Sequence, residues 1–277
     1  MKRKQAEAIA EAVSNLDLDF VKDRLSEIAK NTGKRHTWKH ESHIFVNWLE
    51  DISKPAPYTI FTKGNGKLPF YSFSVLPIVT CPGAGECAKF CYSLKAWRYP
   101  LAFFRQIQNT ILVLTQSPQL VQAWHNLPTN IDFRLYVDGD FDSTETVDFW
   151  FNLCNARPDI KVYGYSKSWT QILEFSGKYP ENYKLNLSSG HSHSVKTRKQ
   201  IKALPIVRGD FITLPIEKSV VGKYGTPKYK QSLKQSAQSA GISKYFACPG
   251  KCGNCTKKGH ACGSETFSSI PILIGIH

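Results

Sequence analysis

Predicted strands and helices alternate along the middle of the chain, and this alternation limits the fold more than any other feature. Runs rich in β-branched and aromatic residues, typical of strands, occur at 131–137, 160–165, 183–187 and 211–216. Helical spacing of apolar residues fills the intervals at 143–156, 169–178 and 194–204. Such units require parallel strands joined by right-handed crossovers. We therefore expect an α/β protein with a parallel sheet, either a full or partial (β/α) barrel or an open doubly wound sheet.

The alternating region is expected to be the middle of three parts. Residues 1–56 are predicted to be helical, with Asp17 or Asp19 capping a second helix. Residues 57–219 form the β/α domain, which opens with strands at 58–62 and 70–79 around the turn Gly64-Asn65-Gly66 and continues with helices at 101–116 and 118–126. Residues 220–277 are a basic, weakly periodic, cysteine-rich extension.

Polar residues follow four successive predicted strands. They are Cys81, Asp138-Gly139-Asp140, Ser166-Lys167-Ser168, and the run from Ser188 to His193. Because the carboxyl ends of parallel strands meet at one edge of the sheet, we expect these residues to share a site. The alternative for Asp138-Gly139-Asp140 is a tight turn that caps the next helix.

Three cysteines, Cys81, Cys87 and Cys91, are bunched after one strand with the spacing C-x5-C-x3-C. The chain shows no apolar secretory segment, so we expect it to be cytoplasmic, where thiols bind metal or iron–sulfur clusters more often than they form disulfides. Three thiolates leave a tetrahedral site one ligand short. That ligand could be a small molecule, or His191, His193 or a late cysteine could close the site.

A second group, Cys248, Cys252, Cys255 and Cys262, has four thiols and intervening glycines. It can wrap a structural zinc ion or a closed iron–sulfur cluster, with His260 as a spare ligand. Cys154 is expected to be a buried apolar residue of its helix. The histidines His36, His40 and His43 can share one helical face, which is interpreted as a polar surface rather than a metal site.

The formal net charge is +14, and most of the excess is concentrated between Lys184 and Lys258. Such a concentration is the electrostatic footprint of a nucleic-acid partner, the alternative being a solvated lysine-rich surface. The candidate contacts are Lys196, Arg198, Lys199, Lys202, Lys223, Lys228 and Lys230. No apolar run is long enough to suggest a membrane partner.

Three motifs, Cys81-Pro-Gly with the following Cys87 and Cys91-Tyr92, 134–141, and 162–168, resemble the gene product 88 type of radical S-adenosylmethionine-like (radical SAM-like) phage and plasmid proteins. The resemblance spans about residues 60–265. It implies a [4Fe–4S] cluster on the first three cysteines, with S-adenosylmethionine on its open iron and an electron donor as partner. The spacing departs from the C-x3-C-x2-C that is commonest in the superfamily, which puts S-adenosylmethionine binding in question.

If this cofactor binds, strand-end position and chemistry indicate the contacts Tyr92, Asp138, Gly139, Asp140, Ser166 and Lys167. Two hypotheses follow. One is a radical SAM-like metalloenzyme acting on or beside nucleic acid. The other is a non-enzymatic nucleic-acid-binding protein in which the cysteines hold structural zinc or closed clusters.

Overall fold

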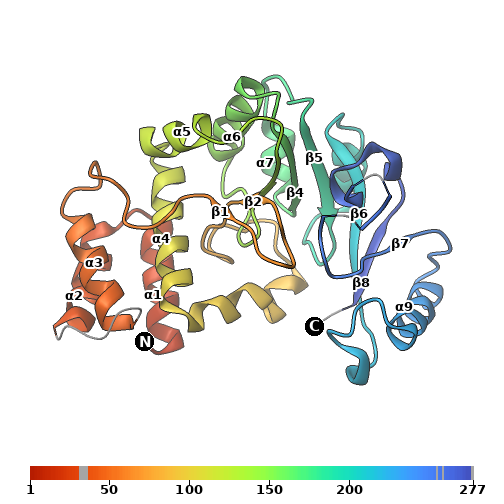
Figure 1. Cartoon of the computed structure of the whole chain (residues 1–277), viewed down its shortest axis with the longest axis horizontal. Helices are drawn as coiled ribbons and strands as arrows, with labels where there is room; N and C mark the ends of the chain where they lie inside the picture. The colour runs from red at the N-terminus through yellow and green to blue at the C-terminus, as the bar shows by residue number, and fades with distance from the viewer. Residues whose placement is uncertain (31–36, 254, 258, 276–277) are drawn as a thin grey trace.

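A computed structural model describes residues 1–30, 37–253, 255–257 and 259–275 (Figure 1). In this part of the chain the helices are α1 (Arg3–Ser14), α2 (Leu18–Ala29), α3 (Trp38–Leu49), α4 (Pro100–Leu114), α5 (Pro118–His125), α6 (Thr144–Ala156), α7 (Trp169–Glu174), α8 (Val195–Lys202) and α9 (Pro227–Ser239). The strands are β1 (Thr62–Lys63), β2 (Tyr71–Ser72), β3 (Asp132–Leu135), β4 (Lys161–Ser166), β5 (Tyr183–Ser188), β6 (Val207–Leu214), β7 (Phe246–Ala247) and β8 (Ile272–Gly275). The order of elements confirms a mixed α/β protein.

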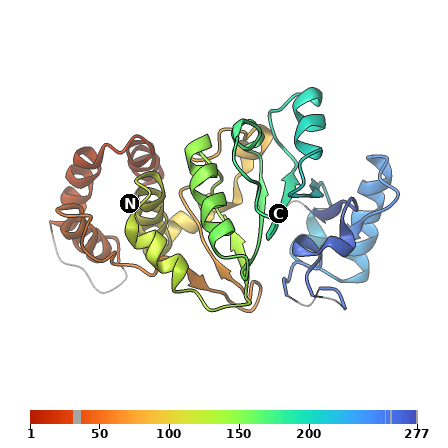
Figure 2. The ribbon, with the colours of Figure 1, turned by 90° about the horizontal axis from the view of Figure 1, so that it is seen from above.

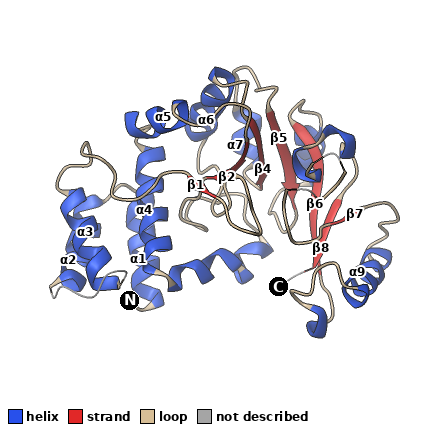
Figure 3. Cartoon of the chain, in the orientation of Figure 1, coloured by secondary structure: helices blue, strands red, loops and turns tan. Residues whose placement is uncertain are grey.

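The strands form one sheet in the order β1-β2-β3-β4-β5-β6-β8-β7 (Figure 3). Every neighbouring pair is parallel except β1 and β2, which form a hairpin. The sheet has β1 at one edge and β7 at the other, so the described strands do not close into a barrel. The expectation of a parallel sheet is therefore confirmed, whereas closure is not.

One face of the sheet carries the main core. Leu135, Val162 and Leu185, from three neighbouring strands, are buried in the same hydrophobic cluster as residues of α6 and α7 such as Trp150 and Ile172. This arrangement follows from the βα pattern, because each crossover helix must return over the sheet. We call the opposite side the polar face. It is built from Arg134, Tyr163, Tyr165, Asn186 and Arg208, and residues 246–270 pack against it.

The N-terminal helices lie beside α4 at one end of the molecule, and α9 lies at the other (Figures 1 and 2). Val13, Leu25 and Phe45 belong to the same hydrophobic cluster as Phe103 and Phe104 of α4. The helices predicted for 1–56 therefore exist and share their core with the β/α region.

Buried amide side chains of α4 fix the segment that leads into the sheet. Gln108 accepts a hydrogen bond from the amide of Tyr58 and donates to its carbonyl, and Asn109 donates to the carbonyls of Ile60 and Ser74. Backbone that is not in a ladder needs such partners when it is buried. These contacts position β2 and the loop that follows it.

Capping residues read from the sequence begin several helices. Asp17, not Asp19, accepts from the amide of Phe20 at the start of α2, and Ser143 accepts from the amide of Thr146 at the start of α6. Both side chains satisfy amides that a first helical turn leaves free.

Four boundaries differ from the sequence-based prediction. The strand expected at 58–62 is reduced to β1, and the strand expected at 70–79 is reduced to β2. Beyond β2 the chain bonds to the loop after β3 instead, with the amide of Val75 donating to the carbonyl of Asp138. Helix α7 ends at Glu174 rather than at 178, and β6 begins at Val207 rather than at 211.

Residues 220–277 are more ordered than their weak periodicity suggested. Helix α9 buries Tyr229, Leu233 and Ala237, which are spaced four apart on one face, and Thr226 caps it. Strand β8 inserts between β6 and β7. The extension therefore completes the sheet.

Candidate metal centre

The loop that carries the first three cysteines runs along the carboxyl ends of the parallel strands. Cys87 and Cys91 flank or lie in the short 3-10 helices η1 (Glu86–Phe90) and η2 (Tyr92–Arg98). The amides of Gly85 and Cys87 both donate to the carbonyl of Gly190, just after β5. The loop is thus bonded by its backbone to a strand end, as the shared-site prediction required.

Three glycines make this close approach possible. A Cβ on Gly83 would lie 1.6 Å from the carbonyl oxygen of Lys167, and one on Gly85 would lie 2.8 Å from the carbonyl carbon of His191. Gly190 has a φ of +75°, and a Cβ on it would lie 3.1 Å from the Cβ of Cys87. Side chains at these positions would push the cysteine loop off the strand ends.

Asp140 is the centre of the strand-end contacts. Its Oδ2 accepts from the amide of Lys167 at 2.6 Å, its Oδ1 accepts from the amide of Phe141, and its own amide donates to the hydroxyl of Thr80. Burial raises the pKa of Asp140, and the hydrogen bond from the Lys167 amide opposes that rise. These bonds join the ends of β3 and β4 to the residue before Cys81, so Asp140 has a positioning role.

Asp138 and Tyr92 lie at the same edge. Gln106 of α4 donates to Oδ2 of Asp138 at 3.1 Å, and burial raises the pKa of Asp138. The hydroxyl of Tyr92 donates to the carbonyl of Val137, although the side chain remains 53% exposed. Gly139 has a φ of +81° and packs against Val75 and Thr80, as expected of a tight turn.

Lys167 and Ser166 end β4. The ammonium of Lys167 donates to the hydroxyl of Ser188 at 3.0 Å, and Ser166 is buried with its hydroxyl accepting from the amide of Ser168. An ammonium has three donors. Lys167 can therefore bind an anionic group while keeping its bond to Ser188.

The three thiols are not equivalent. Cys81 lies within electrostatic range of Cys91, Asp140 and Lys167, and burial raises its pKa to about 12, with Asp140 adding to the rise. Cys87 is fixed separately through Gly190. A metal would have to displace the proton of Cys81 on binding.

The late cysteines gather on the polar face of the sheet. Cys248, Cys255 and Cys262 belong to one cluster with Tyr163, and Cys252 is within electrostatic range of Cys248 and Cys255. Burial raises the pKa of Cys248 to about 11 and that of Cys262 to about 12.

Backbone amides already point at two of these sulfurs. Gly250 donates to Sγ of Cys248 at 3.4 Å, and Ala261 donates to Sγ of Cys255 at 3.3 Å. Hydrogen bonds of this kind stabilise metal-bound thiolates and tune iron–sulfur clusters. The donor set and its amides fit a thiolate-bound metal.

Over residues 1–30, 37–253, 255–257 and 259–275, no three His, Cys, Asp or Glu side chains are arranged to hold a metal ion. The cysteine groups are therefore neighbourhoods of thiols rather than formed coordination spheres. Asn254 and Lys258, within the late group, lie outside the described residues.

The candidate histidines are engaged within the protein. His193 Nε2 meets the carbonyl of Lys167, and Nδ1 of His191 accepts from the amide of His193. Nδ1 of His260 accepts from the amide of Gly263, while its Nε2 lies 3.3 Å from Asp132. Of the helical histidines, His43 is exposed on α3, whereas His36 lies outside the described residues.

Cys154 is fully buried in α6, as expected. Sequence reasoning missed Arg134, whose guanidinium lies 4.8 Å from the ring of Tyr165 and is within electrostatic range of Tyr92 and Cys252. The available signal was an arginine between Phe133 and Leu135, two buried residues of a strand.

The candidate nucleic-acid contacts are all exposed, on α8 and on the segment from Lys223 to Lys230. Two of them are partly neutralised, because Arg198 and Lys202 pair with Asp210 at 3.2 and 2.7 Å.

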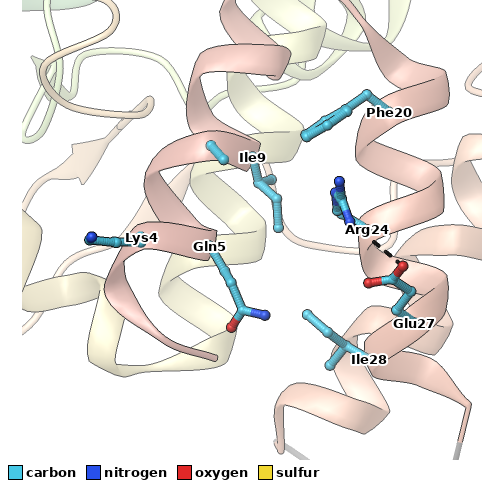
Figure 4. A pocket seen from close by; sticks show the side chains of 8 residues that line it. Lys4, Gln5, Ile9, Phe20, Arg24, Glu27 and Ile28 are labelled. Atoms are coloured by element: carbon cyan, nitrogen blue, oxygen red, sulfur yellow. Dashed lines mark ion pairs between the residues drawn. The ribbon is translucent and has the colours of Figure 1, made fainter.

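One pocket lies beside the loop of the first three cysteines, and another lies away from it. One of about 220 Å³ is lined by Trp169, Ser188, His191, Arg198 and Asp210, and it adjoins Cys87 through Gly190. The other, of about 270 Å³, lies between α1 and α2 beside Phe20, Arg24 and Glu27, away from the cysteines (Figure 4).

Comparisons with known proteins are sparse. The sequence model of one family, described as gene product 88, matches residues 53–267, well over half of the chain. No curated protein and no solved structure matches. No helix in the described residues is long and apolar enough to span a membrane.

Proposed function

The chain belongs to the gene product 88 family, and from this premise we propose that it is a radical SAM-like iron–sulfur protein that acts on, or beside, a nucleic acid. One observation carries the proposal: the amides of Gly85 and Cys87 are bonded to the carbonyl of Gly190, so the loop that carries the first three cysteines lies at the carboxyl edge of a parallel sheet. Ligands bind at this edge in α/β proteins. The parallel run from β2 to β6 supports a partial rather than a full barrel.

In this proposal, the residues at the carboxyl edge of the sheet have different roles. Cys81, Cys87 and Cys91 hold a [4Fe–4S] cluster, and Asp140 keeps their loop against Lys167. Both oxygens of Asp140 accept hydrogen bonds from amides. The ammonium of Lys167, which keeps donors free beside its bond to Ser188, would contact the carboxylate of S-adenosylmethionine.

The cofactor supplies the difficult chemistry. With S-adenosylmethionine bound, a cluster with an open iron would supply one-electron reduction of the sulfonium, the electron coming from a reducing partner. The protein orients the reactants and excludes water, which the buried residues Thr80, Asp140 and Ser166 favour.

The test is metal content and absorbance of protein purified without oxygen. We expect brown protein with more iron than zinc, whose absorbance near 400 nm bleaches with dithionite. Cys87→Ala should lose about half of the iron while its melting temperature stays close to that of the parent. The matched control, Cys154→Ala, should keep all of the iron, because Cys154 is buried in α6.

Colourless protein carrying zinc would rule out the radical mechanism. Loss of folding in Cys87→Ala, but not in Cys154→Ala, would make the first site structural.

A second candidate function is a non-enzymatic nucleic-acid-binding protein with structural zinc. The observation that favours it is that two of the four late thiols, those of Cys248 and Cys255, receive backbone amide hydrogen bonds. This candidate predicts zinc and no cleavage of S-adenosylmethionine.

A further inference from the structure

Two arginines of the polar face lie within electrostatic range of the late cysteines. Arg208 is buried and within electrostatic range of Cys262, and Arg134 is within electrostatic range of both Cys252 and Cys248. Four thiolates around a dipositive metal centre leave two negative charges. Two guanidiniums are the charge complement of such a centre.

The two arginines differ in what else they do. Arg208 donates to the side chain of Asn186 and to the carbonyls of Phe267, Ile270 and Asp210, so its guanidinium is a structural clamp. Arg134 has no ion pair or side-chain hydrogen bond recorded among residues 1–30, 37–253, 255–257 and 259–275, and its buried Nε lacks a partner. A buried donor without an acceptor is costly and calls for an explanation.

The sheet fixes where Arg134 can point. It pairs with Ser72 on β2 and with Tyr163 on β4, and its guanidinium lies 4.8 Å from the ring of Tyr165. Tyr92, which follows Cys91, and Asp138 are also within its electrostatic range. Arg134 is therefore within electrostatic range both of Cys252 and of Tyr92, the residue after Cys91.

We propose that Arg134 is the counter-charge of an anionic metal–thiolate centre on Cys248, Cys252, Cys255 and Cys262 and that it sets the reduction potential of that centre. The inference rests on the proposed function, because a reduction potential requires that the metal centre be an iron–sulfur cluster. A fixed positive charge favours adding an electron to a nearby cluster, and the effect is strong where water is excluded. Arg134 acts through its positive charge and does not bind the metal.

The experiment compares Arg134→Met and Arg134→Lys, each in a Cys87→Ala background, so that the first site does not contribute. The matched control is Arg105→Met, because Arg105 of α4 also has a buried Nε without a partner but has Tyr58, not a cysteine, as its electrostatic neighbour. The readouts are iron per chain and the midpoint potential from a spectroscopic titration.

We expect Arg134→Met to keep its iron and to shift the potential negative by at least a tenfold change in the reduction equilibrium, about 59 mV for one electron. Arg134→Lys should shift it less, and Arg105→Met should not shift it. Equal potentials in Arg134→Met and Arg105→Met would overturn the inference. If Arg134→Met does not fold, Arg134→Gln is the second neutral variant and the same criterion applies.

If the purified protein carries zinc, the proposed function and the claim about the reduction potential both fail, and the counter-charge role of Arg134 is tested separately. Zinc transfer to a coloured chelator should then be at least tenfold faster in Arg134→Met than in Arg105→Met. Equal rates would overturn the counter-charge role.

Discussion

Gly83 leaves no room for a side chain, because its Cβ would overlap the carbonyl oxygen of Lys167 and would lie 2.7 Å from Nε2 of His193. We expect Gly83→Ala to lower the free energy of unfolding by about 1–3 kcal/mol, the usual cost of overpacking. It should also lower the metal content, since the cysteine loop must move away from β4. Urea unfolding and iron analysis measure both effects.

Gly66→Ala is the matched control, because nothing lies within 4 Å of its Cβ position in the β1–β2 turn. It should change neither quantity. An unchanged Gly83→Ala protein would mean that the loop does not depend on its contact with the strand end.

At the scale of single residues, the sequence predicted which residues would lie at the strand ends but not which groups they would bond to. The strand-end rule predicted that Asp140, Lys167 and Cys81 would lie at one edge; Asp140 is bonded to the amide of Lys167, and Cys81 is within electrostatic range of both. It did not predict that amides would occupy both oxygens of Asp140, because a side chain's hydrogen-bond partners depend on loop geometry. Arg134 was missed for the same reason.

Among the helices, the end of α5 is held by a single side chain. Arg157 follows α6 and donates to the carbonyls of Trp124, His125, Leu127 and Pro128, satisfying groups that a helix end leaves free. Asp159 holds this guanidinium at 2.7 Å. The hydrogen bonds of Arg157 thus join the end of α6 to the end of α5, and Asp159 holds the guanidinium that makes them.

This pair predicts a pH dependence. The hydrogen bond from Arg157 lowers the pKa of Asp159 below 3.8. A lowered acid pKa gives stability that is present above the unfolded pKa and lost as the pH falls through the folded value. Asp159→Asn should therefore melt below the parent at pH 7, and the difference should shrink as the pH falls below about 4.

Glu181→Gln is the control, since Glu181 pairs with Lys178 at 3.6 Å with its side chain 90% exposed. Its melting temperature should follow that of the parent at each pH. A constant difference for Asp159→Asn would show that the loss is not electrostatic.

Long periodic elements were predictable and short ones were not. Helices α4 and α6 and strands β4 and β5 lie within a few residues of their predicted bounds, because burial imposes their period. Strands β1 and β2 are two residues each, since the following segment bonds to the loop after β3 instead of to a ladder. Helix α9 was detectable from the spacing of Tyr229, Leu233 and Ala237.

Across the whole molecule, most of the excess positive charge lies between Lys184 and Lys258 and not in the N-terminal helices. The exposed lysines of α8 predict nucleic-acid affinity that falls with salt, by a slope of about 0.9 per phosphate contact. Lys196→Gln combined with Lys199→Gln should reduce that slope by about 2 and weaken binding equally for different sequences. Fluorescence anisotropy over a salt series measures it.

Lys2→Gln combined with Lys4→Gln, on or beside α1 at the other end of the molecule, is the control and should leave the slope unchanged (Figure 2). Equal slopes in both double variants would place the contact elsewhere.

The sheet order has a consequence for how the protein is made. Strand β7 precedes β8 in the chain but lies outside it, so β7 has no neighbour until β8 has been synthesised and inserted beside β6. The intervening residues carry Cys248, Cys252, Cys255 and Cys262. The amide of Cys248 therefore gains its partner, the carbonyl of Leu273, only after Ile272–Gly275 has been synthesised.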